Sequence, residues 1–204
     1  MRLHRLHALR RTAFALTGAA AIVPGTVACG SGSAAHPATD TGFAGAALPA
    51  GVPAPDFTLE DQSGRRVSLA GYRGQVVVIA FISSSCGATC ILIAQQIRGA
   101  LDELPRPVPV LFVSVDPRAD TRAQVRRFLD RVALTGRARY LSGSPAALRP
   151  IWRAYGVVPL TSSRAAFERA ASVLLLDRNG RRRVLFGVEQ LTPEGVAHDV
   201  RKLS

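Results

Sequence analysis

Several residue types are scarce in this chain of 204 residues, and their scarcity restricts what the protein can do. With 3 cysteines, 4 histidines and 1 methionine, a site for a soft metal ion has few donors to draw on. Lysine occurs only at Lys202, so arginines supply nearly all of the formal net charge of +12. Aromatic residues make up 6% and are not interleaved with the basic ones, as they would be in many nucleic-acid-binding surfaces. We therefore interpret the charge as a solvated surface and expect no nucleic-acid partner.

The apolar stretch near the N-terminus, residues 13–23, is shorter than the roughly 20 residues that a transmembrane helix needs. It follows a segment with four arginines and precedes small residues, which is typical of a signal peptide. The segment ends in VACG at residues 27–30, which resembles a lipoprotein signal with lipidation of Cys29. The alternative for Cys29 is an incidental thiol near a cleavage site. We expect residues 1–28 to be removed and the protein to be extracytoplasmic, anchored to the cell membrane as a lipoprotein.

Residues 29–54 are rich in small residues and proline without periodicity, which predicts a flexible linker. Residues 55–204 are predicted to form one domain of ordinary size. Its strands are expected at residues 56–60, 66–69, 76–82, 108–115, 139–141, 172–176 and 183–186, and helices after the cysteines and at residues 121–134, 145–155 and 193–204. Parallel crossovers followed by a hairpin predict an α/β fold, a thioredoxin-like mixed sheet flanked by helices with an N-terminal hairpin extension.

The centre of this pattern is a buried strand that leads through a serine-rich turn into Cys86, Cys90 and an amphipathic helix. Residues four apart on a regular helix have Cβ atoms about 5–6 Å apart, whereas a disulfide requires roughly 3.5–4.5 Å. A bond between these cysteines therefore requires Cys86 to lie in the turn, which Gly87 permits. The positive end of the helix dipole favours thiolate there. We expect Cys86 to be an exposed nucleophile and Cys90 its buried resolving partner; a purely structural disulfide or two core cysteines is the alternative.

Four segments together indicate a family: FISSSCGATC, SVDPRADT, AYGV and VLLLDRNG. From Ala54 onward the chain resembles the Sco/SenC proteins, membrane-tethered thioredoxin-fold proteins that handle copper for cytochrome oxidase assembly. The resemblance implies that Cys86 and Cys90 bind copper as thiolates, cycle between dithiol and disulfide, or do both. It also implies a partner: the copper-site subunit of cytochrome oxidase or another exported thiol protein.

The chain departs from that family at the third copper ligand, a histidine whose position is occupied here by Arg169. His198, in the last predicted helix, is expected to be exposed and not to replace it, and Ile91 stands where a proline usually follows the second cysteine. Two thiolates suit Cu(I) but are a poor site for Cu(II), and a guanidinium near them would repel a cation while stabilising thiolate. Asp116 is expected either near the site or simply in the turn before Pro117.

Two hypotheses of different classes remain. In the first, the protein is a thiol–disulfide oxidoreductase in which Cys86 attacks a partner disulfide and Cys90 resolves the mixed disulfide. In the second, it is a copper chaperone that binds Cu(I) through the same two sulfur atoms. The substitution by Arg169 favours the first.

Overall fold

The protein folds around a six-stranded mixed sheet in the computed structural model, which describes residues 41–204. The strand order is β1-β8-β7-β4-β5-β6, and β2 and β3 form a separate hairpin. The strands are β1 (Ala46–Ala47), β2 (Thr58–Glu60), β3 (Arg66–Ser68), β4 (Val77–Ile82), β5 (Val110–Ser114), β6 (Arg139–Leu141), β7 (Ser172–Leu176) and β8 (Arg182–Gly187). The helices are α1 (Ala88–Glu103), α2 (Arg122–Arg131), α3 (Pro145–Tyr155), α4 (Arg164–Ala170) and α5 (Pro193–Leu203), with 3-10 turns η1 (Leu69–Tyr72) and η2 (Val188–Gln190).

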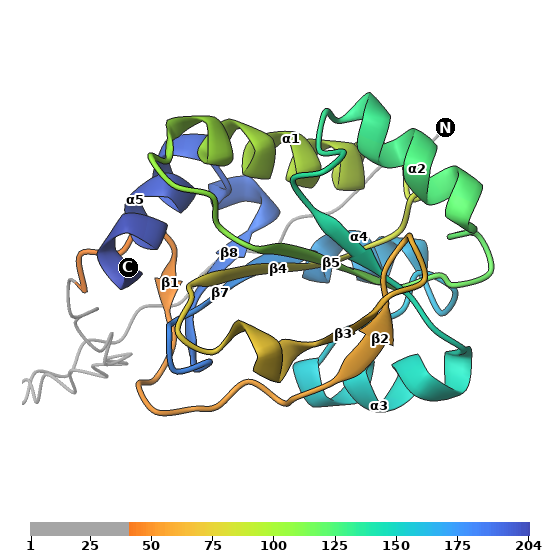
Figure 1. Ribbon diagram of the computed structural model, residues 1–204, viewed down its shortest axis with the longest axis horizontal. Helices are drawn as coiled ribbons and strands as arrows, with labels where there is room; N and C mark the ends of the chain where they lie inside the picture. The colour runs from red at the N-terminus through yellow and green to blue at the C-terminus, as the bar shows by residue number, and fades with distance from the viewer. Residues whose placement is uncertain (1–40) are drawn as a thin grey trace, which may run out of the picture. The chain divides into compact units, whose positions relative to one another are not determined.

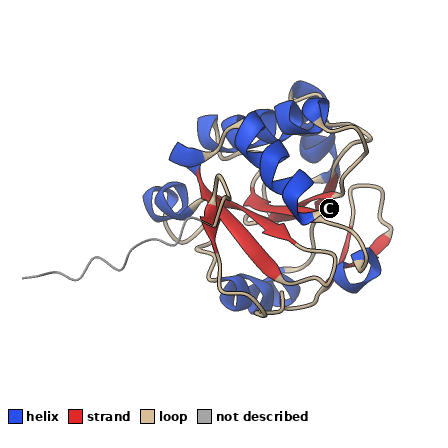
Figure 2. Ribbon diagram, turned by 90° about the vertical axis from the view of Figure 1, so that its left-hand side faces the viewer, coloured by secondary structure: helices blue, strands red, loops and turns tan. Residues whose placement is uncertain are grey.

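Strands β4, β5 and β6 run parallel, whereas β7 and β8 are antiparallel to their neighbours. Helices α1, α2 and α5 lie on one face of the sheet and α3 on the other (Figure 1), so that helices flank the sheet on both sides (Figure 2). Every residue of β4 and of β5 is consequently buried. Each fully buried valine or isoleucine there stabilises the fold by about 1.5–3 kcal/mol relative to an exposed one. The predicted mixed sheet and N-terminal hairpin are confirmed.

The predicted linker includes residues 41–54, and here the structure differs from the prediction. Strand β1 pairs antiparallel with β8 at the edge of the sheet. Asp199 of α5 is fully buried and accepts hydrogen bonds from the backbone N–H groups of Ala44, at 2.8 Å, and Gly45, at 3.0 Å. This part of the predicted linker is therefore packed on the domain. The predicted signal peptide, Cys29 and the remainder of the predicted linker lie outside the described residues.

Helix α4 occupies a segment that the sequence pattern left unassigned. It is only 7 residues long and buries one large side chain, Phe167, so apolar periodicity cannot reveal it. Its cap is local, because the Ser163 hydroxyl accepts a hydrogen bond from the backbone N–H of Ala166 at 3.2 Å. Within residues 41–204, no helix has the length and apolar character that crossing a bilayer demands.

Asp61 joins the β2–β3 hairpin to strand β6. Its side chain is 1% exposed and accepts hydrogen bonds from the Ser63 hydroxyl at 2.6 Å, the Arg65 backbone N–H at 3.0 Å and Arg139 Nη1 at 2.7 Å. Burial acts to raise the pKa of this carboxyl group, but the hydrogen bonds from Ser63, Arg65 and Arg139 outweigh it and lower the pKa to about 2.

Replacing Asp61 by asparagine is expected to destabilise the protein at neutral pH but not in acid. The folded pKa of about 2 lies below the ordinary value of 3.8, so the ionised group contributes about 2 kcal/mol at neutral pH. That contribution is present above the ordinary pKa and is lost as the pH falls through the folded pKa. Urea unfolding of wild type and Asp61→Asn, from neutral pH down to the folded pKa, measures this contribution. The control is Glu103→Gln, which replaces an exposed carboxyl group. A difference independent of pH would contradict the prediction.

Candidate functional site

Cys86 and Cys90 form a disulfide at the point where β4 turns into α1. Cys86 lies before the first residue of the helix, and the Cα atoms of the pair are 5.8 Å apart. Gly87 between them is the helix cap and has a φ of 82°, in the left-handed region that glycine adopts without steric cost. The prediction that a bond requires Cys86 to lie off the regular helix is therefore confirmed.

The exposure predicted for Cys86 is wrong for this disulfide form. Cys86 is 1% exposed and Cys90 is 0% exposed, so only the burial of Cys90 is confirmed. Both backbone groups of Cys86 are held by the domain: its N–H donates to the Ser83 carbonyl at 3.3 Å, and its carbonyl accepts from Arg164 Nη1 at 2.8 Å. These two hydrogen bonds fix the backbone of Cys86 in the turn.

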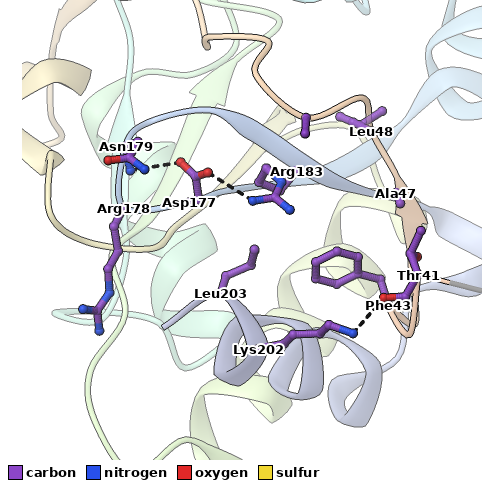
Figure 3. A pocket seen from close by; sticks show the side chains of 11 residues that line it. Thr41, Phe43, Ala47, Leu48, Asp177, Arg178, Asn179, Arg183, Lys202 and Leu203 are labelled. Carbon is purple, nitrogen blue, oxygen red and sulfur yellow. Dashed lines mark hydrogen bonds and ion pairs between the residues drawn. The ribbon is translucent and has the colours of Figure 1, made fainter.

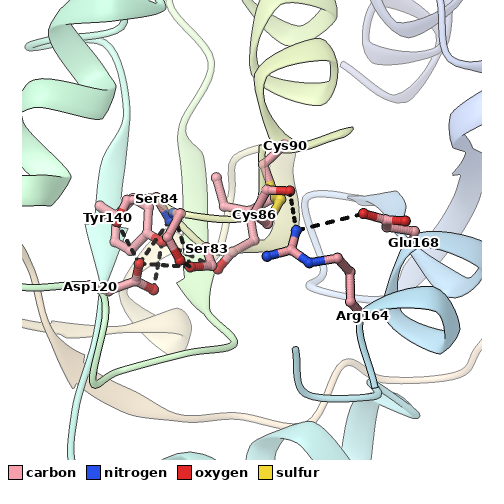
Figure 4. Close-up of a disulfide and its surroundings, with 10 residues drawn as sticks. Ser83, Ser84, Cys86, Cys90, Asp120, Tyr140, Arg164 and Glu168 are labelled. Carbon is pink, nitrogen blue, oxygen red and sulfur yellow. Dashed lines mark hydrogen bonds and ion pairs between the residues drawn. A yellow bond between two sulfur atoms is a disulfide. The ribbon is translucent and has the colours of Figure 1, made fainter. Parts of the chain in front are cut away.

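A buried carboxylate, Asp120, organises the turn before the cysteines. Its Oδ1 accepts hydrogen bonds from the Ser83 hydroxyl at 3.0 Å and from the Ser84 backbone N–H and hydroxyl at 2.8 and 2.7 Å. Its Oδ2 accepts from the hydroxyls of Ser114 at 2.6 Å and Tyr140 at 2.8 Å. The network therefore connects the C-terminal end of β4 to β5 and β6, and Figure 4 shows Ser83, Ser84 and Tyr140 around Asp120 beside the cysteine turn. Because Oδ1 binds the turn while Oδ2 binds side chains of β5 and β6, Asp120 connects the turn to these two strands.

Tyr140 remains a hydrogen-bond donor in this network. Burial raises its pKa well above the ordinary value, and the negative charge and hydrogen bond of Asp120 raise it further. Its hydroxyl therefore stays protonated at neutral pH. Asp120 was not among the residues predicted for the site; it directly precedes the helix predicted from residue 121. Thr121 is the cap, and its hydroxyl accepts from the Gln124 N–H.

Asp116 behaves as a turn residue. Its carboxylate accepts one weak hydrogen bond, from the Ala119 N–H at 3.4 Å, and its carbonyl accepts from the N–H groups of Ala119 and Asp120. Of the two interpretations left open for Asp116, these contacts favour the turn. The spacing between Asp116 and Asp120 in SVDPRADT was the signal in the sequence that could have identified the second aspartate.

An arginine does lie beside the cysteine turn, but it is Arg164 at the start of α4. Its Nη1 reaches the Cys86 carbonyl and lies 3.7 Å from Glu168 Oε1, one helical turn further along (Figure 4). Arg169 is exposed, and its side chain makes no hydrogen bond or ion pair with any residue of 41–204. The guanidinium contact therefore comes from a residue that the sequence analysis had not singled out.

The surroundings of the two sulfur atoms bear on whether they could hold a metal ion. The described part of the chain contains no group of three or more histidine, cysteine, aspartate or glutamate side chains placed to hold a metal ion. His198 is exposed in α5, as predicted, and its Nδ1 lies 2.8 Å from Asp199 Oδ1. Ile91, in the place of the usual proline, is a partly buried residue of α1.

Solved structures of known proteins share the fold of this chain. The apo Sco1 protein of Thermus thermophilus is 25% identical, with 79% of this chain and 97% of that chain covered and a TM-score of 0.65. Copper-bound ScoI of Bradyrhizobium japonicum is 26% identical, with coverages of 75% and 100% and a TM-score of 0.57. At 17% identity, the thioredoxin domain of a thiol-disulfide oxidoreductase from Bacteroides vulgatus shares the fold with a TM-score of 0.59. The thioredoxin-like fold class is confirmed.

Curated relatives match over shorter stretches. The mitochondrial SCO2 homolog of Bos taurus is 33% identical over 109 residues, which are 50% of this chain and 40% of that protein. The chain spans less than half the length of the curated relatives it matches. The sequence profile of the SCO1/SenC family, in contrast, matches residues 47–204, which is most of the chain and includes strands β2 to β8. The chain therefore belongs to the SCO1/SenC family.

Proposed function

We propose that this protein is an exported, membrane-tethered thiol–disulfide protein that acts through Cys86 and Cys90 during assembly of the copper site of cytochrome oxidase. The observation that carries the proposal is the cysteine pair itself, which is joined at the start of α1 without a third metal-ligating side chain beside it among residues 41–204. A helix N-terminus favours the thiolate that exchange requires. The client is the copper-site subunit or another exported thiol protein.

The exchange begins from the reduced form of the pair. The Cys86 thiolate attacks one sulfur of a client disulfide, and the other client sulfur leaves as a thiolate. Cys90, also as thiolate, then attacks the Cys86 sulfur and releases the second client sulfur. The client is reduced by two electrons and the protein ends with the Cys86–Cys90 bond described above. An external dithiol must reduce that bond before another cycle.

Interrupting this exchange should leave the client attached to the protein. In a Cys90→Ser variant the mixed disulfide through Cys86 cannot be resolved, so we expect an adduct that dithiothreitol releases. Non-reducing electrophoresis of membranes, followed by mass spectrometry of the released partner, detects it. The matched control is Cys86→Ser, which keeps one thiol of the pair but lacks the proposed nucleophile and should give no adduct. Equal trapping by both variants, or none by Cys90→Ser, would rule out the proposed division of roles.

The second candidate function is binding of Cu(I) as cargo by the same cysteines, and it is favoured by the likeness to the copper-bound ScoI of Bradyrhizobium japonicum. When reduced, Cys86 and Cys90 provide two thiolates, a donor set that suits Cu(I). Arg164 adds a positive charge beside Cys86, which opposes a cation of higher charge. The two cysteines would hold Cu(I) only after their disulfide is reduced. The bound Cu(I) would then be the cargo that passes to the client.

A further inference from the structure

Five cationic side chains gather around the turn between β7 and β8. Arg178, Arg181 and Arg183 lie in or next to this turn, and Arg73 donates a hydrogen bond from its Nη1 to the Asn179 carbonyl at 2.9 Å. Lys202 near the end of α5 lines the same cavity as Arg178 and Arg183. We name this set the cationic end. All of its members except Arg183 are exposed.

Only one carboxylate of the described residues, Asp177, lines the cavity at the cationic end. Its Oδ1 is occupied by the backbone N–H groups of Asn179 and Arg181, both at 2.9 Å. Its Oδ2 lies 3.3 Å from Arg183 Nη1, so Asp177 offsets the charge of one arginine at most. The remaining cations have no carboxylate partner within residues 41–204 and keep a local excess of positive charge.

The cavity measures about 630 Å³ and combines three of the cations, Arg178, Arg183 and Lys202, with an apolar wall (Figure 3). Phe43 lies between two of them, with its ring centre 4.8 Å from Lys202 Nζ and 5.9 Å from the Arg183 guanidinium carbon. Leu48 and Leu203 also line it. Lys202 donates a hydrogen bond to the carbonyl of Thr41 at 2.7 Å. Thr41, the first described residue, therefore borders this cavity.

The cationic end and the disulfide lie at opposite ends of the sheet. Strand β7 runs antiparallel to β4, with Leu176 paired to Val77, so the turn after Leu176 lies beside the start of β4. Cys86 follows the end of the same strand. The 6 residues of β4 separate the two by about 20 Å.

We propose that the cationic end binds the phosphate headgroups of an anionic lipid surface and turns the disulfide away from the bilayer. Charge complementarity supports this, since basic side chains near such a surface each strengthen binding about five-fold. Four of the five cations are exposed and can therefore reach such a surface. A nucleic-acid site would be expected to alternate its cations with exposed stacking aromatics. Among the described residues that line this cavity, the only aromatic is the partly buried Phe43. The proposal does not depend on the thiol chemistry proposed above.

The test measures binding of the full chain to lipid vesicles. A triple variant, Arg178→Gln with Arg181→Gln and Lys202→Gln, removes three exposed cations. The matched control removes three exposed arginines of α2 by Arg126→Gln, Arg127→Gln and Arg131→Gln. All proteins carry Cys29→Ser, which excludes an acyl chain, and all share residues 1–40, whose contribution cancels. Cosedimentation uses vesicles of phosphatidylcholine with and without phosphatidylglycerol.

We expect the triple variant to bind phosphatidylglycerol vesicles on the order of 100-fold more weakly than the parent, while the control loses less than about five-fold. Added salt should also weaken the binding of the parent to phosphatidylglycerol vesicles, because it screens the attraction between the cations and the headgroups. Equal losses in the two variants, or equal binding of the parent to neutral vesicles, would overturn the proposal. Binding to a single-stranded DNA oligonucleotide is measured in parallel. If the triple variant loses DNA binding but keeps vesicle binding, the cationic end binds nucleic acid and the lipid proposal is wrong. Normal trapping of a client by Cys90→Ser alongside a failed lipid test would leave only the thiol function standing.

Discussion

Asp120→Ala is expected to lower the free energy of unfolding by about 3–5 kcal/mol, because it leaves several buried donors without their acceptor. The Ser84 N–H and the hydroxyls of Ser114 and Tyr140 all donate to this carboxylate. Each unsatisfied buried group costs about 1–3 kcal/mol. Because the hydroxyls can partly rearrange toward other acceptors, the total destabilisation is smaller than three times the largest of these costs. Urea unfolding of the oxidised protein, monitored by circular dichroism, measures the loss.

The matched control for this prediction is Asp116→Ala, four residues earlier in the same loop. Its carboxylate accepts only one hydrogen bond, at 3.4 Å, so we expect a loss within about 1 kcal/mol. A second measurement connects the network to the thiols: every 1.4 kcal/mol that Asp120→Ala removes from the disulfide form alone raises its reduction potential by about 30 mV. Similar losses for the two aspartates would show that the network does not restrain the turn.

Arg169→His is expected to raise the affinity of the reduced protein for Cu(II) by at least about tenfold, or 1.4 kcal/mol. The substitution removes a cation and adds an imidazole, the ligand that two thiolates lack for Cu(II). Cu(I) affinity should change little, because the two sulfur atoms already suit that ion. Anaerobic titration with each copper ion measures both affinities, and tight Cu(II) binding by the wild type would contradict the account of Arg169.

The geometry of α4 suggests a second variant for this titration. Arg164 contacts the Cys86 carbonyl, and Glu168, four residues on, shares its face of the helix, whereas Arg169 is exposed. Glu168→His therefore tests whether the neighbouring position faces the sulfur atoms more directly. In a Cys86→Ser background neither histidine should raise the affinity. Two results would show that α4 does not supply the missing ligand. One is a gain in Cu(II) affinity in the Cys86→Ser background, and the other is no gain for either histidine variant when both cysteines are present.

Much of the fold was predictable from local patterns. A continuous apolar run predicted β4, and apolar residues at helical spacing predicted α1. Side-chain caps marked where other helices begin: the Ser144 hydroxyl accepts from the Ala147 N–H, and the Thr192 hydroxyl accepts from the Gly195 N–H. These signals are reliable because each depends on residues within a turn or two of one another. Helix α4 was missed because seven residues with one large buried side chain carry too little of such a pattern.

The sequence by itself determined that two cysteines meet where a buried strand becomes a helix, and that Cys86 must leave the helix for a disulfide to form. Only the tertiary structure decided what surrounds them. Asp120 reaches Ser83 across 37 positions of the chain, and Arg164 reaches Cys86 across 78. Those contacts, and the burial of Cys86 that accompanies them, arise when separate strands and helices pack together where β4 ends. No periodicity within a short segment encodes them.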